Sequence, residues 1–104
     1  MKQKNQPTPD ALAAFQRLGE RLLKARKLRG WSSQDTATRC GINRNTLRTL
    51  EQGKMVNSGV LLKVLSQYHM LHELELLAQP DNDKLGQALS NHTPQRTPDL
   101  DNNF

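Results

Sequence analysis

Four polar residues close together in the chain carry the side chains best suited to recognising another molecule: Arg44, Asn45, Arg48 and Thr49. An arginine can pair bidentately with guanine and an asparagine with adenine, while a threonine offers a methyl and a hydroxyl group. Their spacing places them on one side of a short helix, away from its apolar residues. This chemistry suits the edges of nucleic-acid bases, provided that the rest of the chain holds the helix in position.

Residues 31–51 are predicted to form two short helices joined by a tight turn at Gly41. Ser32 and Asp35 form a start signal for the first helix that resembles a capping box, and Asn43 caps the second helix. Gly41 supplies the positive φ that a rapid change of direction requires. The inward-facing apolar residues are Ile42, Leu47 and Leu50. This layout is that of a helix-turn-helix, whose second helix enters the major groove of DNA.

A longer helix is predicted ahead of this pair. Thr8, Pro9 and Asp10 form a helix start, and Gly30 ends the helix as a C′ glycine. One face of the helix is apolar, with residues at gaps of three and four: Leu12, Phe15, Leu18, Leu22, Ala25 and Leu28. The other faces are basic and are expected to raise the positive potential near the site; they carry Arg17, Arg21, Lys24, Lys27 and Arg29.

Downstream, Ser58 is predicted to cap a helix that runs to Tyr68, and a break near residues 69–70 leads to a leucine-rich helix before Pro80. Five helices and no alternating strand pattern predict an all-α domain over residues 9–79. Residues 1–8 are predicted to be a disordered arm, and residues 80–104 a polar, mostly disordered tail in which residues 84–90 can form two helical turns.

The chain has 104 residues and a net charge of +5, which is distributed unevenly. Residues 1–54 hold 12 Lys and Arg against 4 Asp and Glu, whereas residues 55–104 hold 3 against 6. A basic half beside an acidic half indicates a surface for a polyanion and a separate surface for another partner. No apolar run approaches the roughly 20 residues of a membrane span, and no signal peptide is apparent, so we expect a cytoplasmic protein.

Catalytic and metal chemistry are not indicated. His69 and His72 have a spacing that permits metal binding, but no further carboxylate or cysteine pair supports a site. The single cysteine, Cys40, excludes an intramolecular disulfide and is expected to be a small buried hydrophobic residue. Without a nucleophile–base pair or a glycine-rich phosphate loop, we predict that the protein is not an enzyme and needs no metal or other cofactor.

Residues 18–78 resemble an XRE-type helix-turn-helix domain, the family of the Cro and lambda repressors. The resemblance rests on Leu22, Ala25 and Arg26, on residues 61–65, and above all on an ungapped central run. That run contains Ala37, Gly41, Ile42, Asn43, Arg44, Thr46, Leu47, Leu50, Glu51, Gln52, Gly53 and Lys54. The sequence departs from the family pattern at Thr36 and Cys40, where leucine is usual, and at Ser33, where glutamine is frequent.

The resemblance implies a compact five-helix fold, with a flexible arm and tail, that binds palindromic operators as a dimer. It places Arg44 and Asn45 at base edges, followed by Arg48 and Thr49. Phosphate contacts are expected from Ser33, Asn43, Lys54, Asn57 and Ser58, which fix register without reading sequence. The resemblance also implies a structural ion pair between Arg26 and Glu51.

The leucines of the second half suggest what else the protein contacts. A single half-site gives weak binding, so a homodimer is expected, with Leu71, Leu74 and Leu77 as the dimer or partner surface. The alternative is that these leucines belong to the domain core. Residues 61–78 also resemble the HipB-type antitoxins, which would make the protein an autorepressor bound to a HipA-type kinase toxin. Two other readings remain open: a stand-alone repressor of phage or mobile-element type, and a protein–protein adaptor that does not read DNA.

Overall fold

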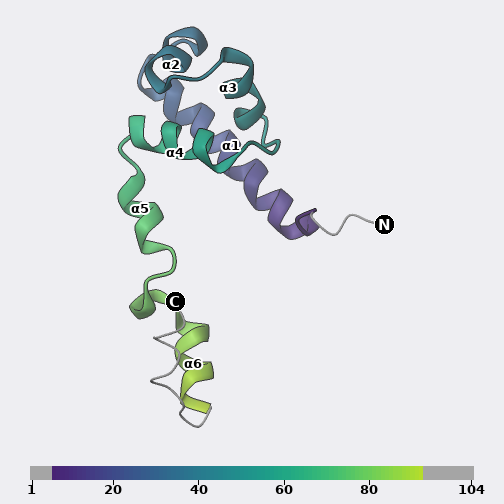
Figure 1. The fold of residues 1–104 in the computed structure, drawn as a ribbon, viewed down its shortest axis with the longest axis vertical. Helices are drawn as coiled ribbons and strands as arrows, with labels where there is room; N and C mark the ends of the chain where they lie inside the picture. The colour runs from purple at the N-terminus through teal and green to yellow at the C-terminus, as the bar shows by residue number, and fades with distance from the viewer. Residues whose placement is uncertain (1–5, 93–104) are drawn as a thin grey trace. The chain divides into compact units, whose positions relative to one another are not determined.

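The computed structural model describes residues 6–92 and divides the chain into two compact units, Met1–Met70 and Leu71–Phe104. Most of the predicted disordered arm, and the end of the predicted tail, lie outside the described residues. The first unit holds four helices and contains the whole predicted helix-turn-helix (Figure 1). No strand occurs in residues 6–92, in agreement with the predicted all-α class.

Helix α1, Pro9–Leu28, begins and ends at the predicted residues. Thr8 is the N-cap, and its hydroxyl oxygen accepts a hydrogen bond from the amide of Ala11 at 3.2 Å. Arg29 caps the other end, and Gly30 follows with a φ of 72°, a left-handed conformation that glycine adopts without strain. Both ends of α1 are therefore determined by residues within the helix or next to it.

Helices α2, Ser33–Cys40, and α3, Arg44–Glu51, form the predicted helix-turn-helix. The Ser32 hydroxyl accepts from the amide of Asp35 at 3.0 Å, but the Asp35 carboxylate bonds to Arg39, so the capping box is only half formed. Gly41 has a φ of 71° and turns the chain toward Asn43, the N-cap of α3. Figure 1 shows the two helices beside each other, where α2 packs on α3 and α3 on α1.

Helix α4, Ser58–Gln67, begins one residue away from the predicted cap. Asn57, rather than Ser58, is the N-cap, and its Oδ1 accepts from the amide of Val60 at 2.9 Å. Both residues are good caps, and the structure uses the asparagine, so the prediction for Ser58 was wrong by one position. The predicted break after the helix occurs at His69, which has a φ of 61°.

The core of the first unit lies where α1, α2, α3 and α4 meet. Its fully buried side chains come from all four helices and from the residue that caps α4: Leu22, Thr36, Leu47, Leu50, Val64 and Tyr68. Gly19 lets α1 approach α3, because a Cβ at that position would lie 2.5 Å from the Leu50 carbonyl oxygen and 2.8 Å from the Gly53 nitrogen. Cys40 is also buried, as expected for a residue at an apolar position.

The second unit contains α5, Leu71–Leu76, the 3-10 turn η1, Pro80–Asn82, and α6, Lys84–His92. Helix α6 covers the predicted turns at residues 84–90 and extends two residues further. None of the residues 71–91 is buried. Among the described residues, no helix combines the length and the apolar character needed to cross a membrane.

Candidate nucleic-acid interface

Helix α3 presents the predicted base-reading residues on one exposed surface. The side chains of Arg44, Asn45 and Arg48 are exposed, and none of them forms a hydrogen bond or ion pair with another residue of the described chain. At 100° per residue, they span an arc of roughly 100° on the helix, away from the buried Leu47 and Leu50. The donors of this surface are therefore available to a ligand.

Thr49 lies at the edge of the same surface and is half-buried. Its hydroxyl donates a hydrogen bond to the carbonyl oxygen of Asn45 at 2.9 Å. Because the only hydroxyl proton is used inside α3, the methyl group is the part of this side chain best placed to contact a ligand. Of the two roles open to Thr49 from its sequence position, this geometry favours the apolar one.

Four of the five predicted phosphate contacts lie at helix N-termini. Ser33 is the first residue of α2, Asn43 caps α3, Asn57 caps α4 and Ser58 is the first residue of α4. Neither α3 nor α4 has an acidic residue in its first turn. The partial positive charge of these helix ends is therefore not neutralised locally, which suits an anion such as a phosphate.

The two capping asparagines use only their oxygen atoms in capping. Oδ1 of Asn43 accepts from the Asn45 amide at 2.7 Å, and Oδ1 of Asn57 accepts from the Val60 amide. The Nδ2 amides of both residues have no hydrogen-bond acceptor among residues 6–92. Each asparagine can thus hold its helix and donate a hydrogen bond to a phosphate oxygen at the same time.

Lys54 and Gln52 follow the end of α3. Lys54, the fifth predicted phosphate contact, is exposed, and its backbone amide donates to the Thr49 carbonyl oxygen at 3.0 Å. Gln52 is exposed and lies on the same side of the helix as Asn45 and Arg48. Gln52 was not predicted as part of this surface, although a residue four positions after Arg48 lies on the same side of a helix.

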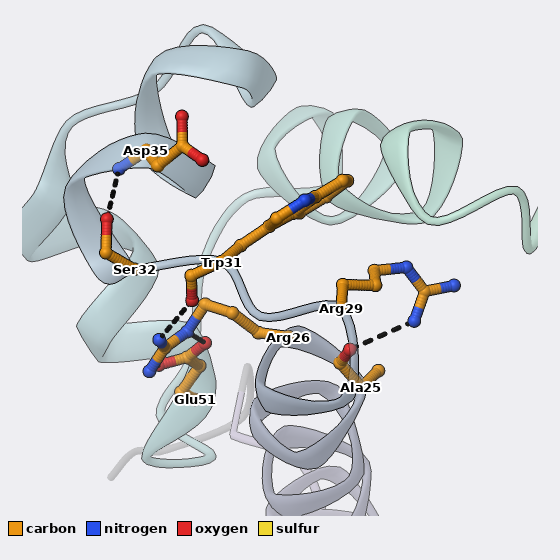
Figure 2. A network of polar contacts seen from close by, with 7 residues as sticks. All are labelled: Ala25, Arg26, Arg29, Trp31, Ser32, Asp35 and Glu51. Atoms are coloured by element: carbon orange, nitrogen blue, oxygen red, sulfur yellow. Dashed lines mark hydrogen bonds and ion pairs between the residues drawn. The ribbon is translucent and has the colours of Figure 1, made fainter.

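The ion pair between Arg26 and Glu51 holds the end of α3 against α1 (Figure 2). Arg26 Nε and Nη2 donate to the two carboxylate oxygens at 2.7 and 3.2 Å, and Nη1 donates to the Trp31 carbonyl oxygen at 3.0 Å. The hydrogen bond with Glu51 raises the pKa of Arg26, so the guanidinium stays charged although its side chain is only 11% exposed. Arg26 is therefore a scaffold residue, with its donors directed to the protein.

A stack of aromatic and arginine side chains joins α2 to the ends of α1 and α4. The guanidinium of Arg39 lies 4.3 Å from the centre of the Trp31 ring, and the Trp31 and Tyr68 rings are 6.0 Å apart. The guanidinium of Arg29 lies 4.9 Å from the centre of the Tyr68 ring. It also donates hydrogen bonds to the carbonyl oxygens of Tyr68 and Ala25. These contacts fix the position of α2, which carries Ser33 at its N-terminus.

The residues of the predicted partner surface belong to the second unit. Leu71 is 38% exposed and Leu77 is 75% exposed, while Leu74 is partly covered. They share this unit with acidic residues, Glu73, Glu75, Asp81 and Asp83, against a single described lysine, Lys84. Within residues 6–92, no cluster of three His, Cys, Asp or Glu side chains is arranged to hold a metal ion.

A known protein family matches the part of the chain that carries these helices. A family model described as Helix-turn-helix matches residues 22–76, which is more than half of the chain. The matched range includes α2, α3, α4 and α5 whole and the end of α1 from Leu22 onward. A search of curated proteins found no match to the chain.

Proposed function

The chain belongs to the helix-turn-helix family of DNA-binding regulators, and from this premise we propose that it is a sequence-specific repressor that binds a palindromic operator as a dimer. The observation that carries this proposal is the exposed surface of α3, where the side chains of Arg44, Asn45 and Arg48 form no hydrogen bond or ion pair within the described chain. The membership is in a family of regulators rather than of enzymes.

In this proposal, α3 enters the major groove and its first turn reads bases. Arg44 donates two hydrogen bonds to a guanine and Asn45 pairs with an adenine, each contributing about 1–3 kcal/mol of discrimination against another base. Arg48 and Gln52 extend the surface, and Thr49 offers its methyl group to a thymine. The N-termini of α2, α3 and α4 contact phosphates on either side of the groove and fix the register.

Selection of binding sites from a random duplex library by the full chain tests this proposal. We expect a palindromic sequence, bound far more tightly than random DNA, with an affinity that falls steeply with salt. Replacing Arg44 by Ala should relax the preference at a single position in each half-site. Lys63→Ala, which removes an exposed cation of α4 outside the proposed interface, should leave the preference unchanged. Selection of no sequence would favour a protein–protein adaptor instead.

We further propose that the leucines of the second unit form the dimer contact. Leu71 and Leu77 are exposed on a unit that buries none of its residues 71–91, and a palindrome requires two copies of α3 related by a two-fold axis. Sedimentation of Leu71→Asp and Leu77→Asp variants tests this contact, with Leu62→Asp in the first unit as the control. If only Leu62→Asp abolished the dimer, the dimer contact would lie on α4 instead.

The same leucines, set among acidic residues, also fit a protein partner such as a HipA-type kinase toxin. In that case, the repressor would be an antitoxin that controls its own operon. A kinase-like gene beside the gene for this chain, together with co-purification of its product with the native protein but not with Leu77→Asp, would support the antitoxin. A stable homodimer that does not bind the neighbouring gene product would support a stand-alone repressor.

A further inference from the structure

A second group of cations lies on α1, on the side turned away from α3. Helix α1 meets α3 at Gly19, where a Cβ would collide with the backbone of Leu50. At 100° per residue, Arg17, Arg21 and Lys24 lie roughly 140–160° around α1 from Gly19. We call these three residues the outer strip of α1. Because the outer strip faces away from α3, it does not face the DNA that α3 would hold.

The outer strip carries a net positive charge that the described chain offsets only in part. Arg17, Arg21 and Lys24 are not buried, and no hydrogen bond or ion pair joins them to another residue in the range 6–92. Arg17 and Arg21 are four residues apart, a spacing at which like charges repel on a helix. Glu20, four residues before Lys24, offsets part of this charge, but the strip remains net positive, and an outside anion would relieve the repulsion.

The spacing of the outer strip suits the phosphate backbone of DNA. At 1.5 Å per residue, Arg17 and Lys24 are separated by about 10.5 Å along the helix axis. A DNA strand carries one phosphate per about 3.4 Å of duplex axis, so three cations over this length match about three phosphates. All three residues of the strip are cations, and one exposed aliphatic side chain, Leu28, follows a turn after Lys24 on the same side. The centre of a protein–protein interface is instead depleted of charge and rich in aromatic side chains.

We propose that the outer strip of α1 is a second DNA-binding surface, which contacts phosphates without reading sequence. Its partner is a second duplex segment, bound on the opposite side of the domain from α3. One protein would then join two stretches of DNA, the first chosen by sequence and the second by charge alone. This surface goes beyond the operator recognition proposed for α3 and does not depend on it.

The test measures binding of the full chain to a short duplex of random sequence over about 50–200 mM salt. The starting protein is Arg44→Gln/Arg48→Gln, which removes the cations of α3 and leaves the outer strip intact. Adding Arg17→Gln, Arg21→Gln and Lys24→Gln should reduce the slope of log K against log salt by about 2.7, because each phosphate that a cation neutralises adds about 0.9 to it. The charge-preserving set Arg17→Lys, Arg21→Lys and Lys24→Arg should keep the slope.

The outcomes separate the proposal from its rivals. An unchanged slope in the triple glutamine variant, with an unchanged melting temperature, would overturn it. Strip-dependent binding of poly-L-glutamate as tight as that of the duplex would also overturn it, because the partner would then be an acidic protein. A failure to select a palindrome would affect only the function proposed for α3, since this test uses random DNA and a protein without the α3 cations.

Discussion

Arg26 of α1 and Glu51, the last residue of α3, are joined by two hydrogen bonds, at 2.7 and 3.2 Å. The third donor of Arg26 reaches the carbonyl oxygen of Trp31, just before α2 (Figure 2). A single side chain thus connects the first helix, the loop that precedes the second and the end of the third. The orientation of α3, the helix proposed to read DNA, therefore depends on a residue whose donors are directed toward the protein.

Replacing Arg26 by Ala should lower the free energy of unfolding by about 2–3 kcal/mol, since it leaves a largely buried carboxylate and a carbonyl oxygen without their donor. Urea denaturation of the full chain measures this change. Arg21→Ala, which removes an exposed arginine from the same helix, should stay within about 0.5 kcal/mol of the native protein. Equal losses in the two variants would show that the ion pair has no special structural role.

Gly19→Ala should destabilise the fold, although alanine is favoured over glycine in a helix by about 1 kcal/mol. The added Cβ would lie 2.5 Å from the Leu50 carbonyl oxygen, and that backbone cannot move without shifting α3. We expect a lower melting temperature and weaker DNA binding together. Glu20→Ala, at the neighbouring exposed position, is the control. A Gly19→Ala protein as stable as the native one would mean that α1 and α3 are not closely packed.

Thr36→Val should stabilise the protein by about 1–2 kcal/mol. The Thr36 side chain is fully buried, and its hydroxyl has no hydrogen-bond partner among the described residues. Valine keeps the branched shape and removes the unpaired polar group. At the exposed Thr38, whose oxygen accepts from Gln34 at 3.3 Å, the same change should have little effect on the melting temperature. A loss of stability at Thr36 would imply a partner for its hydroxyl.

Stability should fall between pH 10 and pH 12 because of Tyr68. Burial raises the pKa of this phenol from 10 to about 12, with smaller contributions from Glu51 and Cys40. The unfolded chain ionises first, so the stabilisation is complete below pH 10 and is lost as the pH rises to about 12. Two pH units correspond to at most about 2.7 kcal/mol. Tyr68→Phe should lack this decrease; parallel curves for the two proteins would contradict the prediction.

Asn57 offers a way to separate capping from phosphate binding. Asn57→Asp keeps an oxygen for the Val60 amide and adds a negative charge at the N-terminus of α4, so stability should be retained. DNA binding should nevertheless weaken, because the charge repels phosphate and the Nδ2 donor is removed. Asn57→Ala should instead cost about 1 kcal/mol of stability. Unchanged DNA affinity in Asn57→Asp would remove this residue from the interface.

The helix ends could be predicted from the sequence because their signals are local. Thr8, Ser32 and Asn43 each cap a helix through an atom two or three residues away, and Gly41 needs only its own conformational freedom. At the start of α4, two adjacent residues were both good caps, so the local rule did not distinguish Asn57 from Ser58.

The contacts that could not be predicted join residues that are far apart in the chain. Nothing in the sequence pairs Trp31 with Tyr68, whose rings meet only once α1, α2 and α4 have packed. A glycine inside a long helix, such as Gly19, is a weak sign of a close contact. The structure shows that the contact is with the backbone of α3. The position of the Thr49 hydroxyl, bonded to Asn45, likewise decides which part of the side chain is available to a ligand.

The ring of Trp31 lies close to both the guanidinium of Arg39 and the ring of Tyr68, and its own carbonyl oxygen accepts from Arg26. It is the only tryptophan in the chain, and Tyr68 is the only tyrosine. The protein therefore carries a single indole fluorophore where α2 meets the ends of α1 and α4, and its only tyrosine, an energy donor to tryptophan, lies beside it. Unlabelled protein thus reports optically on the packing that holds α2 in place.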